Sequence, residues 1–126
     1  NMEKDCPFCL NNLNSEILLE NNFSYAIYDK FPVSKGHILI IPKNHNSNYF
    51  DLSLEEQKEC LILLNNAKKI IDKEFKPDGY NIGINVNKDA GQTIWHAHIH
   101  LIPRYGGDVE EPRGGVRGVI PSKRNY

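Results

Sequence analysis

The chain has 126 residues, 40% of them hydrophobic, and its 15 basic and 16 acidic side chains give a formal net charge of −1. This length suffices for one domain with a hydrophobic core and is too short for two, and the near balance of charge excludes a bulk field that would attract nucleic acid or an anionic membrane surface. No apolar run approaches the roughly 18 to 20 residues that span a bilayer, so we expect a soluble, cytoplasmic protein that binds neither nucleic acid nor membrane.

Three cysteines do not suggest a disulfide framework. Their number is odd, and Cys60 lies within a helix-like stretch, whereas Cys6 and Cys9 form the sequence CPFC. In a reducing compartment such residues are thiols or metal ligands, and Cys-x-x-Cys is the spacing of zinc knuckles. A redox pair and two merely buried thiols are the alternatives.

Two short strands are predicted next, over residues 24–29 (SYAIYD) and 36–42 (GHILIIP). The first is rich in aromatic and β-branched residues, and the second is an apolar run between a glycine and a proline. The turn-like sequence KFPVSK joins them. Strands joined by such short turns favour antiparallel pairing.

One amphipathic helix is predicted from Leu54 to Phe75. Ser53 and Glu56 have the spacing of a capping box, and apolar residues then recur at every third or fourth position. Pro77, in the sequence Pro-Asp-Gly, ends the pattern. The apolar stripe of this helix is expected to pack against a sheet.

Two more strands are predicted after the helix, over residues 80–87 (YNIGINVN) and 93–103 (TIWHAHIHLIP), with the loop KDAGQ between them. The order strand, strand, helix, strand, strand predicts an α+β fold in which the helix covers one face of an antiparallel sheet. The Gly/Pro-rich residues 105–126 are expected to form an extended tail that lies on another surface.

The last predicted strand carries histidines at every second position, His96, His98 and His100. Side chains at such positions share one face of a strand, so the three imidazoles point the same way and the apolar residues between them face the helix. A solvated sheet face is one interpretation, and a single metal site made of all three is another, provided that strand twist brings the rings together. We favour a division of labour among the three.

That division follows if CPFC binds zinc. Two thiolates leave tetrahedral zinc in need of two more nitrogen or sulfur ligands, and there is no second cysteine pair, so the others must be histidines. His45 and His96 are available at predicted strand ends without using His98 or His100. Four protein ligands would leave no open position on the ion. The zinc would therefore be structural.

His98 and His100 are then free to act on phosphate. A neutral imidazole is a good nucleophile toward phosphorus, and a charged one stabilises phosphate oxygens. The neighbouring loop NKDAGQT offers main-chain N–H groups for the same purpose. The pattern suggests covalent catalysis through a phosphohistidine, with no metal at the reaction centre.

The sequences GHILIIPKNH and NVNKDAGQTIWHAHIHLIPR together resemble the histidine triad (HIT) family, whose signature is His-x-His-x-His. The resemblance runs from Cys6 to Pro103, so we expect a HIT domain over residues 2–104 and a tail over residues 105–126. It implies a five-stranded antiparallel sheet with one long helix, and a homodimer in which two sheets continue as one. It also implies an enzyme that hydrolyses or transfers the nucleotidyl group of AMP-X compounds, which are nucleoside phosphoramidates or dinucleoside polyphosphates with a purine, adenosine above all.

By this resemblance, His98 matches the nucleophile that forms a nucleotidyl-imidazole intermediate, and the main-chain carbonyl of His96 would hold its far ring nitrogen. His100 matches the residue that contacts the phosphate oxygens, and His37 matches a further catalytic histidine. The remaining matches are Gln92, a catalytic residue, and Thr93 at the phosphate or leaving group, Asn85 and Gly91 near the phosphate site, Asp29 at the ribose hydroxyls, Phe8 and Ile27 along the base pocket, and Cys6, Cys9, His45 and His96 as structural zinc ligands.

The resemblance leaves the leaving group open. Thr93 stands where the phosphoramidase branch has serine, and the tail differs from those of related branches. Arg113 and Arg117 either reach a polyphosphate, within the chain or across a dimer interface, or are solvated tail residues. The alternatives to a hydrolase are a dinucleoside polyphosphate phosphorylase and a non-catalytic nucleotide-binding or interaction module with structural zinc.

Overall fold

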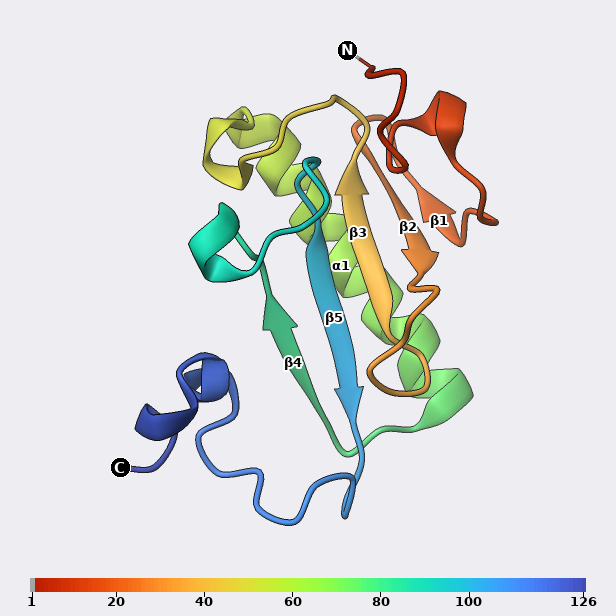
Figure 1. Cartoon of the computed structure of the whole chain (residues 1–126). Helices are drawn as coiled ribbons and strands as arrows, with labels where there is room; N and C mark the ends of the chain where they lie inside the picture. The colour runs from red at the N-terminus through yellow and green to blue at the C-terminus, as the bar shows by residue number, and fades with distance from the viewer. Residues whose placement is uncertain (1) are drawn as a thin grey trace.

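Five strands and one helix build the fold of residues 2–126, the part of the chain that the computed structural model describes (Figure 1). The strands are β1 (Leu19–Glu20), β2 (Ser24–Tyr28), β3 (Ile38–Pro42), β4 (Gly79–Gly83) and β5 (Ile99–Arg104). All neighbouring strands are antiparallel, in the order β1-β2-β3-β5-β4. The predicted α+β class, with a five-stranded antiparallel sheet and one long helix, is confirmed.

The helix α1 (Leu54–Phe75) begins and ends as its sequence predicts. The Ser53 hydroxyl accepts the Glu56 N–H at 3.0 Å, and the Glu56 carboxylate accepts the Ser53 N–H at 2.9 Å, which completes the capping box. The helix stops at Lys76, whose φ of 49° is left-handed. This helix buries one side of the sheet (Figure 1).

The two faces of the sheet are buried by different parts of the chain. Against the helix lie strand residues such as Ile38, Ile99 and Leu101. On the opposite face, Ile27 and Leu39 pack against the N-terminal segment that carries Cys6, Phe8 and Cys9. His100 pairs with Leu39 across β3 and β5, so it shares that face. The N-terminal segment therefore covers the part of this face that carries His98, where the Phe8 ring packs, whereas His100 is half-buried.

The last strand begins at Ile99, not at Thr93 as predicted. The ladder between β3 and β5 ends at the pair Ile40 and Ile99. Before that point the Ala97 N–H donates to the Asn46 carbonyl at 2.7 Å, and the Pro42 carbonyl accepts the His96 ring N–H at 2.7 Å. Only His100 of the three histidines therefore lies within a strand. Similarly, β4 ends at Gly83, short of the predicted residues 84–87.

Residues 105–126 fold back toward the sheet. Two 3₁₀ helices, η4 (Gly115–Val119) and η5 (Pro121–Lys123), lie on the β4 side of the molecule (Figure 1). Arg113 and Arg117 stack on Tyr126, with guanidinium carbons 5.0 and 4.8 Å from its ring centroid. The tail thus has its own packing and is not merely extended. No helix in residues 2–126 is both long and apolar enough to cross a membrane.

Candidate functional site

His98 and His100 lie side by side where the chain enters β5, with ring centroids 5.0 Å apart. His98 Nδ1 lies 2.8 Å from the carbonyl oxygen of His96. Because a carbonyl only accepts, Nδ1 carries the ring proton and Nε2 keeps its lone pair. Burial lowers the pKa of His98, which favours the neutral ring. The Phe8 ring packs edge-on against it at 5.2 Å, so His98 has the protonation state of a nucleophile in an enclosed setting.

The protonation state of His100 is set by a chain of hydrogen bonds that begins at the main chain. The Val33 N–H donates to His37 Nδ1 at 3.0 Å, so the His37 proton is on Nε2. His37 Nε2 lies 3.0 Å from His100 Nδ1 and donates to it. His100 is left with its proton on Nε2. Burial, followed by the neighbouring imidazoles of His98 and His37, lowers the pKa of His100 to about 4, so the ring is a neutral hydrogen-bond donor.

The segment before β3 places His37 in this relay. Gly36 has a φ of +86°, and a Cβ added to it would lie 2.9 Å from the Phe75 ring, so glycine is required where the chain turns into the strand. Asp29, at the end of β2, lies 3.5 Å from His37 Nε2 through Oδ2, while its Oδ1 accepts the Phe31 N–H at 2.9 Å. The two strand ends therefore bring Asp29 and His37 to the same point.

Asp29, His37 and His100 also have the donor types of a metal site, with ligand atoms within 4.8 Å of one another. A cation at His37 Nε2 would need the lone pair of that nitrogen and would move the proton to Nδ1. There it would face the N–H of Val33, which already points at Nδ1. Two donors cannot share that position, so the geometry favours a hydrogen-bond relay over a metal centre.

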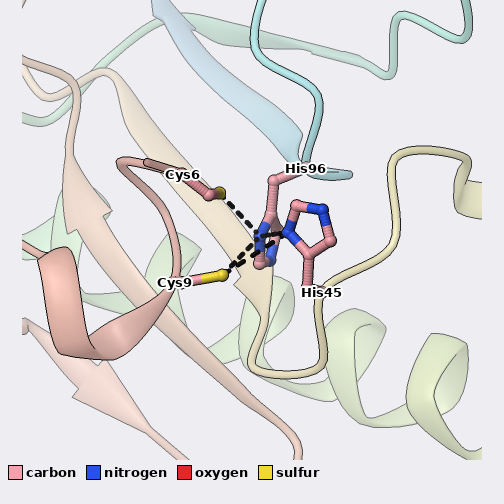
Figure 2. A group of neighbouring side chains, drawn as sticks. All are labelled: Cys6, Cys9, His45 and His96. Atoms are coloured by element: carbon pink, nitrogen blue, oxygen red, sulfur yellow. Dashed lines mark hydrogen bonds between the residues drawn. The ribbon is translucent and has the colours of Figure 1, made fainter. Parts of the chain in front are cut away.

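A second cluster of donors fits a metal ion (Figure 2). Its members, here called the metal-ligand cluster, are Cys6, Cys9, His45 and His96. The separations are 3.3 Å from Cys6 Sγ to His96 Nδ1, 3.4 Å from Cys9 Sγ to His45 Nδ1, and 3.3 Å between the two Nδ1 atoms. Tetrahedral zinc with bonds of about 2.0 to 2.3 Å would hold its ligand atoms about 3.3 to 3.8 Å apart. The four side chains could thus bind a metal.

His96 belongs to this cluster through its ring, and through its main chain it contacts the histidine pair, by which we mean His98 and His100. Its Nε2 donates to the Pro42 carbonyl, which leaves the Nδ1 lone pair directed at the cysteines. Burial lowers the pKa of His96 to about 4, which keeps that lone pair free. Its carbonyl oxygen fixes His98. One residue therefore ties the metal-ligand cluster to the ring of His98.

An open cleft of about 1190 Å³ lies beside His100. Asp29, His37, Asn85 and His100 line one part of it, and residues of the C-terminal tail line another. A separate hollow of about 430 Å³ is lined by Cys6, His45 and Thr93, among others. The structure thus places Asn85 in the same cleft as His37 and His100, and Thr93 beside the metal-ligand cluster.

Several predicted residues have structural contacts that the sequence did not indicate. Gln92 is buried; its Oε1 accepts the Asn87 N–H at 2.8 Å, and its Nε2 donates to the carbonyls of Ser47 at 2.7 Å and Ile94 at 3.1 Å. A phosphate contact by Gln92 would require these bonds to be exchanged. The neighbouring Gly91 is exposed, with a φ of 97°. Phe8 and Ile27 are buried in one cluster on the histidine face.

Comparison with known proteins places these features in a wider context. A family model described as HIT domain matches residues 11–107. The Bacillus subtilis protein named hit is 35% identical over 106 residues, which make up 82% of this chain and 73% of that protein. A Dictyostelium discoideum protein named bis(5'-adenosyl)-triphosphatase is 35% identical over 96 residues, 76% of this chain and 64% of that protein. The crystal structure of a zinc-bound histidine triad family protein from Mycobacterium smegmatis is similar with a TM-score of 0.77 and 30% identity, covering 85% of this chain and 80% of that one.

Proposed function

The chain belongs to the HIT domain family, and from that premise we propose that it is an enzyme that cleaves AMP-X compounds at the α-phosphate through His98. The observation that carries the proposal is the hydrogen bond from His98 Nδ1 to the His96 carbonyl, because it leaves the Nε2 lone pair free beside the neutral donor His100. The name of the Dictyostelium relative supports dinucleoside polyphosphates as the substrate class.

The reaction would proceed in two displacements. The Nε2 lone pair of His98 attacks the α-phosphorus and forms a P–N bond, while the bond from phosphorus to the leaving group breaks and its electron pair departs with that group. Water then attacks the same phosphorus, the P–N bond breaks, and the electron pair returns to Nε2 as the water proton passes to solvent. His100 donates its Nε2–H to a phosphate oxygen in both steps.

The nucleoside is proposed to lie along the face covered by the N-terminal segment. Asp29 accepts the ribose hydroxyls, since each carboxylate oxygen can accept more than one hydrogen bond, and Phe8 and Ile27 border the adenine. Asn85 is supported by its place in the same cleft as His100. Gly91, Gln92 and Thr93 stay predictions for phosphate or leaving-group contacts.

Zinc is the metal proposed for the metal-ligand cluster. The two thiolates and two imidazoles are the donors that zinc prefers, and the zinc-bound relative supports the assignment. Four protein ligands leave no position for substrate, so the ion would only cross-link the N-terminal segment, the loop of His45 and the chain before β5.

We further propose a homodimer joined through β4. This strand is an edge of the sheet, and its Ile82 side chain is 51% exposed. An unpaired edge with an exposed apolar residue suits strand pairing with a second copy. Light scattering that gave the mass of a monomer at working concentrations would overturn this part of the proposal.

The experiment for the activity is the substitution His98→Ala. It should lower turnover of adenosine 5'-phosphoramidate and diadenosine polyphosphates by about 10²-fold or more, while AMP still binds. Unchanged turnover would remove His98 as the nucleophile. Formation of ADP in the presence of inorganic phosphate would identify a phosphorylase instead. Tight AMP binding without turnover of any AMP-X compound would identify a binding module.

A further inference from the structure

The C-terminal tail contributes one unpaired cation to the large cleft. Arg124 lines this cleft together with the apolar residues Val116 and Val119, and His100 lines it as well. No ion pair or side-chain hydrogen bond of the Arg124 guanidinium is found within residues 2–126. A guanidinium that has no protein partner and borders a cleft is available to pair with an anionic ligand.

Arg124 packs closely against two glycines, Gly114 and Gly118, which leave room for it. Gly114 has a φ of +94°, and a Cβ added there would lie 2.5 Å from the Arg124 carbonyl oxygen and 2.8 Å from its Cγ. A Cβ on Gly118 would lie 3.5 Å from the Arg124 Cδ. The aliphatic part of the Arg124 side chain therefore packs against these glycines. Arg124 is half-buried, although both of its sequence neighbours are exposed.

The other cations near the cleft are already engaged. Arg104 pairs with Asp108 at 2.8 Å. Arg113 and Arg117 stack on Tyr126 and donate to main-chain oxygens at 3.0 and 2.9 Å, so the structure does not direct these two arginines to a polyphosphate. Of the arginines in the described tail, Arg124 is thus the one available to a ligand in the cleft.

Acidic side chains of the cleft do not neutralise this cation. Asp29 stands with the histidines, as described above. Glu111 also lines the cleft, where its carboxylate accepts the main-chain N–H of Arg113 at 3.0 Å and makes no ion pair with Arg124. No carboxylate within the described residues lies within ion-pairing distance of Arg124.

We propose that Arg124 binds the phosphate groups of the leaving group, so that the chain prefers nucleoside polyphosphate leaving groups over neutral amines. The inference rests on the proposed function, in which His98 and His100 hold the α-phosphate. The remainder of the substrate then extends along the cleft, whose volume of about 1190 Å³ is large compared with the roughly 300 to 1,000 Å³ of ordinary small-ligand pockets. The planar guanidinium pairs with phosphate through two parallel hydrogen bonds.

The test compares two substrates that share the AMP half and differ in the charge of the leaving group. Arg124→Ala should lower kcat/KM for diadenosine triphosphate by about 10- to 100-fold, as expected for loss of a charge-assisted pair. The value for adenosine 5'-phosphoramidate should change by less than about threefold. Arg124→Lys, which keeps the charge without the fork, should recover part of the loss. Equal losses on both substrates, or no loss on either, would overturn the proposal.

Arg113→Ala is the matched control, because it alters the same tail but removes a guanidinium that stacks on Tyr126. It should leave the ratio of the two kcat/KM values unchanged. A change as large as that of Arg124→Ala would show that tail packing, and not Arg124 itself, sets the preference.

Equilibrium binding separates this proposal from the proposed function. In the His98→Ala background, calorimetry should show that Arg124→Ala weakens the binding of diadenosine triphosphate by about 10-fold. The affinity for AMP should stay unchanged. If the wild-type chain turned over no AMP-X compound but this binding difference remained, the proposed activity would fail and the role of Arg124 would stand. Equal affinities with and without Arg124 would reject the role of Arg124 alone, and absence of nucleotide binding would reject both.

Discussion

The carbonyl oxygen of His96 lies 2.8 Å from Nδ1 of His98, while the His96 ring lies 3.3 Å from the Cys6 sulfur. The residue that completes the metal-ligand cluster therefore also selects the tautomer of its neighbour. The two roles use different atoms of His96, so neither excludes the other. A rigid cluster would hold the His96 main chain, and with it the ring of His98.

Removal of a cysteine ligand should remove the metal and destabilise the fold. Cys9→Ser is expected to lose bound zinc and to lower Tm by more than about 5 °C, because an ion that binds only the folded state stabilises it. Elemental analysis of the purified protein and thermal unfolding measure both effects. Cys60→Ala is the control, since Cys60 lies on α1 in the core between helix and sheet, outside the metal-ligand cluster, and this variant should keep one ion per chain. A wild-type protein without metal would contradict the assignment of zinc.

His37 should act by positioning His100, not by touching the phosphorus. His37→Phe removes the donor to His100 Nδ1 and should lower kcat by about 10-fold, with KM little changed. His37→Gln, whose amide N–H can reach the same acceptor, should restore part of the rate. If both variants were equally impaired, the relay would not be the reason for the loss.

The relay also predicts how His100 titrates. Its pKa of about 4 lies below the ordinary 6.5, so the ring should stay neutral as the pH falls through 6.5 and gain a proton only near 4. A depressed pKa favours the folded state above pH 6.5, and this stabilisation is lost as the pH falls toward 4. The groups facing the ring are Asp29, His37 and His98. Nitrogen NMR of the imidazole gives the midpoint, and a value near 6.5 would contradict the buried relay.

Gln92 provides a test between two roles. Gln92→Ala removes the three hydrogen bonds that the buried Gln92 amide makes to the Asn87 N–H and to the carbonyls of Ser47 and Ile94, so it should lower the free energy of unfolding by about 1 to 3 kcal/mol. If Gln92 has only a structural role, the folded Gln92→Ala protein should have an unchanged KM for the phosphoramidate. Chemical denaturation and steady-state kinetics on the same variant measure the two quantities. A raised KM with normal stability would instead support the predicted phosphate contact.

The sequence predicts the helix and the sheet because their signals are local. The capping box of Ser53 and Glu56 and the apolar run before Pro42 depend only on near neighbours. The start of β5 at Ile99 depends on its partner strand across the sheet, since the β3–β5 ladder ends at the pair Ile40 and Ile99. Strand pairing is a property of two distant segments, and the pattern of one segment does not contain it.

The candidate site also contains features that the sequence predicts and features that only the folded chain shows. The sequence has no second cysteine pair, which limits the further ligands to histidines, and the structure brings His45 and His96 to Cys6 and Cys9. The donor to His37 is the main-chain N–H of Val33, which has no signature in the sequence. Arg124 was missed because it differs from Arg113 and Arg117 only in what the folded tail leaves unpaired.

Rapid quenching of the wild-type reaction, followed by mass spectrometry of the digested protein, tests the central claim most directly. With either diadenosine triphosphate or adenosine 5'-phosphoramidate, we expect an AMP adduct on the peptide that contains His98, localised to that ring and absent from His98→Ala. The adduct should appear and decay at rates compatible with turnover. Turnover at an undiminished rate in His98→Ala, or an adduct on another residue, would contradict the account.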